Sequence, residues 1–556
     1  MKFSPLIRAP HGAQSRWQSS TGPVGLFLAM LIAAVFIYRY FPAGFIAGTS
    51  SYWLTETDDV TQYIAGFNAY FHSPLKFPLL AFDGFNYPAG TRATFVDIIP
   101  IYSLLLKLVL PADTAPFNPF GFWVALTFVL QAVAGWWVLR ELNVRSWSTL
   151  ICGTVLMVCF PALLGRLGHI SLMSHWILLM AMALYIRSYR LGRVATVGWC
   201  LLLVTGFYVN IYLFVMALVI YLCAVLTSLK GLKGLNLRAI GRASIPFIAL
   251  ALSIFVLLLP MPMGQVSTEW GFGYYSMNLL APITGGTYVT IPDAAMPGQY
   301  EGFNYLGLGV IISLVYAIYH LRQDGWGTLK RHRYLAIFLA LFTCYALSNS
   351  IYMGTRQIAV ISYPDFMTTL TSQFRASGRF FWPVGYTLLI FSLLTLYRRF
   401  PGKVLIPVML VLLCIQVGDL KMQRANFKAG LNRPYTPLLT SSAWDAQTGN
   451  GVNKLYFYPK FRCGKFDSLT TLMPVMKYAA MHHIKMNTGY IARHQPPCDE
   501  HSLTTEIAGA DPASSVFVFV KTEFSDIPSV KRLMPTTDTA QCSDVDFAFV
   551  CHLSRQ

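Results

Sequence analysis

The sequence predicts an all-α polytopic membrane protein of about eleven spanning helices with a small C-terminal α/β soluble domain. Three observations predict this class. Of the 556 residues, 55% are hydrophobic and only 12% are charged, about half the charged fraction of an ordinary soluble domain. The apolar residues stand in long blocks, as they do in spanning helices. From residue 421 onward the blocks disappear and charged residues become frequent.

The spans are read from the apolar blocks in order. They cover 23–46, 118–139, 147–164, 173–187, 195–209, 211–229, 244–262, 304–321, 334–350, 380–397 and 403–419. The first block is too long for a signal peptide and lacks a small-residue cleavage site, so 1–22 is expected to be a cytoplasmic segment before an uncleaved anchor. Ile98–Leu110 is only 13 residues long and carries two flanking prolines, which favours a helix lying at the membrane interface.

The distribution of charge supports this topology. Nineteen Lys and Arg fall in the predicted cytoplasmic segments before residue 420, and eight fall on the opposite side, as the positive-inside rule requires. The net charge of +18 therefore reflects membrane orientation, and no nucleic-acid partner is expected.

The outer side is predicted to carry the long loops 47–117, 263–303 and 351–379, within a membrane domain spanning 23–420. Eleven of the thirteen Asp and Glu before residue 420 also fall there. The orientation rule barely uses acidic residues, and long loops often carry function. The outer face is thus the expected place for chemistry, although outer loops that are simply polar would give the same count.

The tail, 421–556, holds 15 Lys and Arg and 11 Asp and Glu. Strands are predicted at 454–459, 515–521 and 546–553, and helices at 468–483 and 503–508. Four cysteines outside the cytoplasm suggest two disulfides, with three possible pairings. Among these, Cys463–Cys498 with Cys542–Cys551 is the pairing expected, and the six remaining cysteines lie in spans as packing residues.

The first outer loop contains the main candidate acids, Asp58 and Asp59. Thr57 is a plausible N-cap for a helix that starts there, and Asp59, Gln62, Tyr63 and Gly66 would share one face of it. A partly desolvated carboxylate at this place suits a general base. With a second acid, it would instead suit a divalent cation such as Mg²⁺ or Mn²⁺, and a plain capping role accounts for one of the two acids. The second acids considered are Asp58, Asp83 and Asp97.

Two arginines enter the tenth predicted span from the outer side. Arg375 and Arg379 are four residues apart, which places them on one helix face, and two guanidiniums suit a lipid phosphate or diphosphate. Ser377 and Gly378 would let backbone approach this group closely. Arginines that reach toward lipid headgroups are the alternative.

Secondary candidates lie close to the same outer side. Glu301 is expected to pair with Arg375 or Arg379 rather than to act directly, and Glu269 lies in the second long loop. His169, beside Arg166, either helps to bind a donor phosphate or is an interfacial histidine held by hydrogen bonds. No nucleotide-binding glycine loop and no nucleophile-elbow motif is present in the sequence.

The arrangement resembles the GT-C superfamily of integral-membrane glycosyltransferases. The resemblance covers the many spans, the acidic Asp58–Asp59 motif in a long first outer loop and the soluble C-terminal domain. It implies a polyprenyl-phosphate-type or polyprenyl-diphosphate sugar donor.

Several stretches also resemble a bacterial family of GT-C-like membrane proteins, DUF6311. The family pattern has Gly before the first-loop aspartate, where this chain has Asp58, so the motif aspartate is carried over to Asp59 and Asp58 is a possible substitute. The matching stretches are Asp59–Gln62 with Gly66, Asn86–Gly90, Asp97–Pro100, Gly271–Leu280, Tyr300–Gly307 and Phe374–Pro383.

Together these features favour a bacterial inner-membrane glycosyltransferase that acts at the periplasmic face, with a periplasmic tail. It would transfer a hexosyl or pentosyl group from a polyprenyl-linked donor to an envelope glycan, lipid or protein. Asp59 would take the acceptor's proton or hold a metal, and Arg375 and Arg379 would neutralise the leaving phosphate. The alternatives are a transporter or flippase of a lipid-linked saccharide, and a non-catalytic envelope assembly factor.

Overall fold

The computed structural model describes residues 17–229, 236–261, 265–266, 269–449, 451–465, 469–535 and 540–553. The chain is mostly helical and divides into two compact units, each described here by itself. Unit 1 holds 1–42, 122–250 and 269–431, and unit 2 holds 43–121, 251–268 and 432–556. Five of the nineteen Lys and Arg predicted to be cytoplasmic lie outside the described residues, namely Lys2, Arg8, Arg16, Lys230 and Lys233. Ser468, the first residue of a helix predicted in the tail, also lies outside them.

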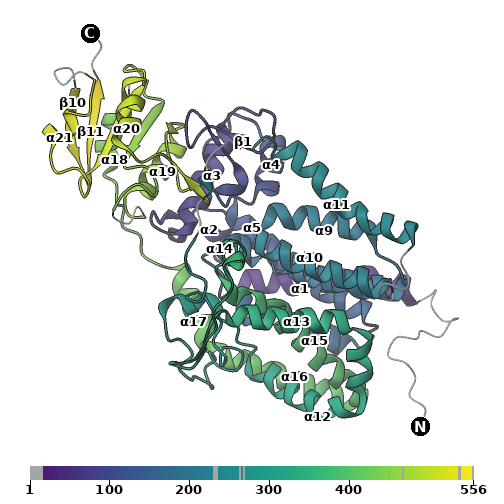
Figure 1. Cartoon of the computed structure of the whole chain (residues 1–556). Helices are drawn as coiled ribbons and strands as arrows, with labels where there is room; N and C mark the ends of the chain where they lie inside the picture. The colour runs from purple at the N-terminus through teal and green to yellow at the C-terminus, as the bar shows by residue number, and fades with distance from the viewer. Residues whose placement is uncertain are drawn as a thin grey trace. The chain divides into compact units, whose positions relative to one another are not determined.

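Unit 1 is built mainly from long apolar helices (Figure 1). Each of the eleven predicted spans coincides with a helix, long or short. These helices are α1 (Trp17–Tyr40), α5 (Phe120–Glu141), α6 (Trp147–Val158), α8 (Trp176–Leu191), α9 (Thr196–Val209), α10 (Ile211–Ser228), α11 (Leu237–Leu257), α12 (Leu308–Arg331), α13 (Arg333–Leu347), α15 (Trp382–Arg399) and α16 (Gly402–Asp419).

Length and composition separate these helices into two groups. Within the described residues, eight helical segments are long and apolar enough to cross a membrane, and four apolar helices are shorter. The shorter ones are α4 (Pro100–Val109), α9, the Leu308–Leu321 part of α12, and α13. Several potential spans in one chain indicate a multi-pass membrane protein.

Short elements join the long helices of unit 1. They are α7 (Pro161–Leu164), η3 (Ile170–Met173), η5 (Pro297–Gly302), β4 (Ser350–Met353), β5 (Arg356–Val360), η6 (Asp365–Met367), α14 (Thr368–Gln373), η7 (Ser377–Phe381) and α17 (Lys421–Leu431). Side chains that cap the backbone set where some helices begin. The Asn210 side chain, for example, accepts hydrogen bonds from the first N–H groups of α10, which have no partner inside the helix.

Unit 2 combines the first long loop with the C-terminal region. The loop contributes α2 (Ala43–Ile46), η1 (Ser51–Leu54), α3 (Asp59–His72), β1 (Ala81–Phe82), β2 (Thr91–Arg92), η2 (Ala93–Phe95) and α4, and β3 (Gln265–Val266) comes from a later segment. Helix α3 packs against α19 (Leu472–Met481) of the C-terminal region. The first long loop and the tail were predicted to belong to separate domains, but they share one compact unit.

The C-terminal region is a five-stranded sheet with helices (Figure 1). The strands are β6 (Lys454–Tyr458), β7 (Lys485–Met486), β9 (Ser515–Val520), β10 (Ala540–Val545) and β11 (Ala548–Leu553), and β8 (His494–Gln495) pairs with β3. Their order in the sheet is β10-β11-β9-β6-β7, with β6 parallel to both β7 and β9. The helices of the region are α18 (Ser441–Thr448), α19, α20 (Glu500–Ala508) and α21 (Ile527–Lys531).

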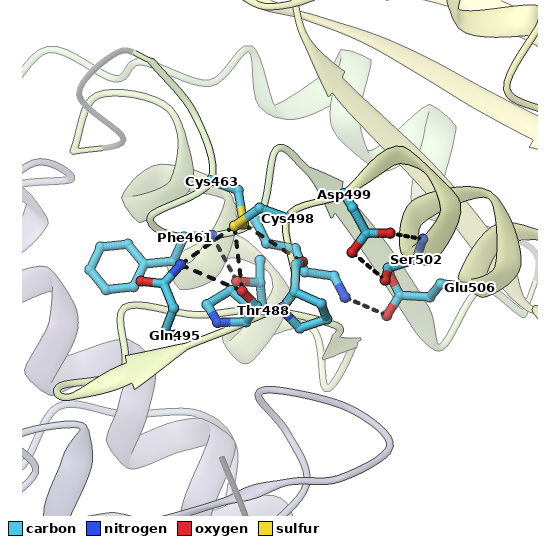
Figure 2. The surroundings of a disulfide bond; sticks show 11 residues. Phe461, Cys463, Thr488, Gln495, Cys498, Asp499, Ser502 and Glu506 are labelled. Atoms are coloured by element: carbon cyan, nitrogen blue, oxygen red, sulfur yellow. Dashed lines mark hydrogen bonds and ion pairs between the residues drawn. A yellow bond between two sulfur atoms is a disulfide. The ribbon is translucent and has the colours of Figure 1, made fainter. Parts of the chain in front are cut away.

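The core of this region follows from the strand sequences. Strand β9 is buried along its whole length, as its continuous apolar run SVFVFV requires of a central strand. Aromatic rings stack across the parallel β6–β9 pair, Tyr456 on Phe517 and Tyr458 on Phe519. Disulfides join Cys463 to Cys498 (Figure 2) and Cys542 to Cys551, the pairs expected from the sequence.

Candidate functional site

Glu301 lies at the centre of a buried group of charged side chains in unit 1. Its carboxylate accepts hydrogen bonds from Nε and Nη2 of Arg379 at 2.9 and 2.8 Å and from Arg166. His169 lies on the same carboxylate at 3.1 Å. Only 3% of the Glu301 side chain and 1% of the Arg166 side chain are exposed. We name Glu301, Arg166, Arg379 and His169 the Glu301 cluster.

The cluster is assembled from three short connections between helices. Arg166 and His169 come from the turn between α7 and η3, Glu301 comes from η5, and Arg379 comes from η7. The three connections are far apart in the sequence. The cluster therefore forms only because the helix ends pack together. Polar groups at such ends can meet without crossing the apolar interior.

Two glycines bring the connections together. A Cβ on Gly378 would lie 2.5 Å from the Cα of Gly302, and a Cβ on Gly302 would lie 2.2 Å from the Ser276 carbonyl oxygen. The Asn304 amide then donates to the carbonyl oxygens of both glycines at 2.9 Å. Gly378, predicted to let backbone approach a phosphate group closely, instead lies against the backbone of η5.

The electrostatics of the cluster favour a negative charge on Glu301. Burial by itself would raise the pKa of Glu301, but the Arg379 and Arg166 guanidiniums outweigh burial and hold the pKa well below its usual range. Two guanidiniums share one carboxylate, so these three side chains carry a net charge of +1. Arg166 Nε is also buried without a hydrogen-bond partner among the described residues.

Aromatic rings line the guanidiniums. Arg379 lies 4.7 Å from the ring centre of Tyr212, and Arg166 lies 5.7 Å from that of Trp382. Such faces stabilise a cation without neutralising it. The net positive charge of the cluster is thus retained.

Arg375 lies outside the cluster and forms a second, looser pair. It is 3.5 Å from Glu269, donates to the Trp270 carbonyl oxygen at 3.2 Å, and keeps 33% of its side chain exposed. The expected helix face shared by Arg375 and Arg379 is not formed. Arg375 precedes the 3₁₀ helix η7, which contains Arg379, so the four-residue spacing of an α-helix does not apply.

The first-loop acids lie in unit 2. Asp58 occupies the N-cap position of α3, in place of the expected Thr57, and Asp59 is the first helical residue. Asp58 forms an ion pair with Arg433 that is about half exposed, so its contribution to stability is small. Asp59 is partly buried.

The helix face predicted to carry Asp59 packs inside unit 2. Gln62 donates to the Tyr490 carbonyl oxygen at 3.1 Å, Tyr63 is 2% exposed with its ring against Phe120, and Gly66 contacts Ile98. Packing of this kind fixes the orientation of α3. It leaves Asp59, at the first turn, as the partly accessible acid of that face.

The remaining acids of the loop have separate surroundings. Asp83 accepts from Lys485 at 3.0 Å, and this contact lowers the pKa of Asp83 although burial alone would raise it. Asp97 is exposed, in a left-handed backbone conformation. Among the described residues, no group of three or more His, Cys, Asp or Glu side chains is placed to hold a metal ion.

Sequence reasoning missed several partners of these residues. Arg166 completes the Glu301 cluster, and its signal was a charged residue in a short turn between two apolar blocks. Lys477 donates to the carbonyl oxygens of Trp53, Leu54 and Thr55 at 3.3, 2.8 and 3.0 Å. No local sequence pattern predicts that a lysine in α19 donates to backbone carbonyl groups some 420 residues earlier in the chain.

Comparison with protein families gives two matches. The profile described as a domain of unknown function, DUF6311, matches residues 29–421, and the profile described as the DUF6311 C-terminal domain matches residues 443–553. No curated protein matches the chain.

Proposed function

The chain belongs to the DUF6311 family, and on that premise we propose that it is a glycosyltransferase of the bacterial inner membrane. It has eleven spans and a periplasmic C-terminal domain, and it takes sugar from a polyprenyl-phosphate-type donor. The acceptor is a glycan, lipid or protein of the cell envelope. Membrane lipids surround the helices of unit 1.

The observation that carries the proposal is the excess positive charge around Glu301. Arg166 and Arg379 face one carboxylate, and Arg375 is partly exposed beside its own looser pair. Guanidiniums bind phosphate oxygens through paired N–H groups, and they do so most strongly where water is excluded. A donor phosphate is the anion class that suits this group.

The proposed transfer uses the Asp59 carboxylate as its base. The acceptor hydroxyl oxygen attacks the anomeric carbon of the sugar, and its proton passes to the Asp59 carboxylate. The bond between that carbon and the phosphate oxygen breaks, and its electron pair stays on the phosphate. No metal is part of this proposal.

The test is transfer of labelled sugar. The full chain, purified in detergent, is incubated with radiolabelled polyprenyl-phosphate sugars and crude envelope acceptors. Wild type is compared with Asp59→Asn and with Asp113→Asn, a matched change at an exposed acid of the same loop. We expect transfer by wild type and Asp113→Asn, and a loss of at least about 100-fold in Asp59→Asn, the usual range for a general base.

Two results would overturn the proposal. Full transfer by Asp59→Asn would remove the assigned base. Binding of the lipid-linked sugar without transfer to any acceptor would replace the enzyme with a transporter of the same ligand.

A further inference from the structure

A narrow apolar groove runs along unit 1 between α1 and α6. Its volume is about 420 Å³. The lining side chains come from Leu28 to Tyr40 on α1 and from Ile151 to Cys159 on and directly after α6. Among the described residues that line the groove, Arg39 is the one charged side chain. Both helices belong to segments long and apolar enough to cross a membrane, so the groove lies at the depth of the hydrocarbon layer.

The dimensions of the groove fit a hydrocarbon chain. Leu28 and Arg39 are the outermost lining residues of α1 apart from Tyr40, and they are about 16 Å apart along the helix axis at ~1.5 Å per residue. Spread over that length, the volume of the groove corresponds to a channel about 5 Å wide. An α-helix with its side chains is about 10–12 Å across. A helix of a second chain therefore does not enter the groove, whereas a single extended acyl chain does.

One end of the groove carries positive charge. Arg39 lies in the last turn of α1 with its side chain exposed, and within the described part of the chain it has no ion-pair partner. Helix α17 adds Lys421, Arg424 and Lys428 and contains no acid. This end of the groove therefore suits an anion.

Helix α17 packs over the charged end through its apolar face. The centre of the Phe427 ring lies 6.3 Å from that of Tyr40 and 5.4 Å from that of Phe41. Gln423 donates to the Pro161 carbonyl oxygen, at the start of α7, at 2.7 Å. The basic helix thus joins the end of α1 to the segment that follows α6.

Two buried polar atoms of α17 lack a partner at this end. Arg424 Nε and Gln423 Oε1 are buried, and neither has a hydrogen-bond partner among the described residues. Arg424 also lies near Cys159, which is part of the groove wall. Buried polar groups are nearly always hydrogen-bonded, so the pair indicates a polar group from outside the chain. A phosphate oxygen is an acceptor for the guanidinium, and a hydroxyl group is a donor for the amide oxygen.

We propose that the groove binds one anionic glycerophospholipid. An acyl chain lies along α1 and α6, and the phosphate lies at Arg39 and Arg424, because guanidiniums bind phosphate oxygens through paired N–H groups. A headgroup with hydroxyls, such as glycerol, supplies the donor for Gln423. Basic residues at a membrane surface attract anionic lipids in the same way. The inference does not depend on the proposed transferase activity, because it uses no residue of the Glu301 cluster or of α3.

The test counts lipids bound to the full chain by native mass spectrometry in a detergent with an uncharged headgroup. The ligands are phosphatidylglycerol, phosphatidylcholine with the same acyl chains, glycerol 1-phosphate and a polyprenyl phosphate. We expect one phosphatidylglycerol per chain, bound at least about tenfold more tightly than zwitterionic phosphatidylcholine, and no binding of glycerol 1-phosphate, which has no acyl chain. Equal affinity for the two phospholipids would overturn the proposal, and so would a preference for the polyprenyl phosphate.

Variants test the groove and its charged end separately. Arg39→Gln and Arg424→Gln should each weaken phosphatidylglycerol about tenfold or more through the loss of a charged hydrogen-bonding group, and should leave phosphatidylcholine unchanged. Val35→Trp should fill the groove and weaken both phospholipids. Val24→Trp is its matched control, at another exposed valine of α1 outside the lining. Arg145→Gln, at an exposed arginine beside the other end of α6, should bind as wild type does.

Thermal unfolding of each variant checks its folding. Val35 and Arg39 are exposed, so Val35→Trp and Arg39→Gln should unfold at the wild-type midpoint. Unchanged affinity for phosphatidylglycerol in either of these two variants would overturn the assignment. Sugar transfer by the same preparations reports separately on the proposed function.

Discussion

Replacement of Glu301 by glutamine should destabilise the protein strongly. The change keeps the shape of the side chain and removes the charge that faces Arg166 and Arg379. Both guanidiniums are almost completely buried, so they would remain in a low-dielectric site without a counter-charge. Breaking a buried pair in this way costs about 3–5 kcal/mol. Glu269→Gln is the matched control, because its partner Arg375 is one-third exposed at 3.5 Å, and such a pair contributes about 1 kcal/mol or less.

The assay is equilibrium unfolding in mixed micelles with increasing sodium dodecyl sulfate, followed by tryptophan fluorescence. The double variant Glu301→Gln/Arg379→Gln adds a stricter test. If the cost comes from an unpaired cation, removal of Arg379 should recover part of it, with a coupling energy of about 0.5–3 kcal/mol. A cost below about 1 kcal/mol for Glu301→Gln, or a double variant whose cost is the sum of the single ones, would refute the reasoning.

Three further predictions concern the packing, titration and cross-linking of the described residues. Gly378→Ala should cost about 1–3 kcal/mol in the same unfolding assay, because its Cβ would meet backbone at 2.5 Å, whereas Gly402→Ala, with nothing within 4 Å, should change the free energy of unfolding little. Burial, with help from neighbouring His483, lowers the pKa of His72 to about 4. The stability that comes from keeping His72 neutral should be fully present above pH 6.5 and should be lost as the pH falls toward 4. Thermal unfolding of His72→Phe should show a weaker dependence on pH over this range. Loss of the Cys463–Cys498 bridge in a double Ser variant should cost ~4 kcal/mol, because it closes a 35-residue loop; peptide mapping without reductant checks the bridge itself.

Much of the helical part could be predicted from the sequence because hydropathy reports directly on membrane-length helices. Each predicted span coincides with a helix, and the Pro-framed block around α4 is a helix of only 10 residues. Length was the weaker prediction, since α9 and α13 are shorter than a full crossing. Helix ends depend on capping and neighbouring backbone, which a hydropathy pattern does not contain.

The candidate site was only partly predictable, because most of its contacts join distant residues. Glu301 with Arg379 followed from opposite charges at two helix ends, yet Arg166 and the glycine contact of Gly302 with Gly378 required the packed structure. The prediction of strands in the tail was also incomplete. Strand β10 has an alternating and mostly polar sequence, and β7 is only two residues long, so neither gives a hydrophobic signal of its own.

The shared unit of first loop and tail has a consequence for biosynthesis. Gln62 contacts Tyr490, 428 residues later, and Asp58 pairs with Arg433, 375 residues later. Ribosomes synthesise the chain from its N-terminus to its C-terminus, so α3 is made long before its partner α19. The contacts of α3 with Ile98 and Phe120 can form early, but the part of α3 that packs against α19 has no native partner while the later helices are being made. A chain truncated before α19 would therefore leave apolar side chains of α3 exposed. Exposed apolar surface of this kind is what chaperones and proteases recognise.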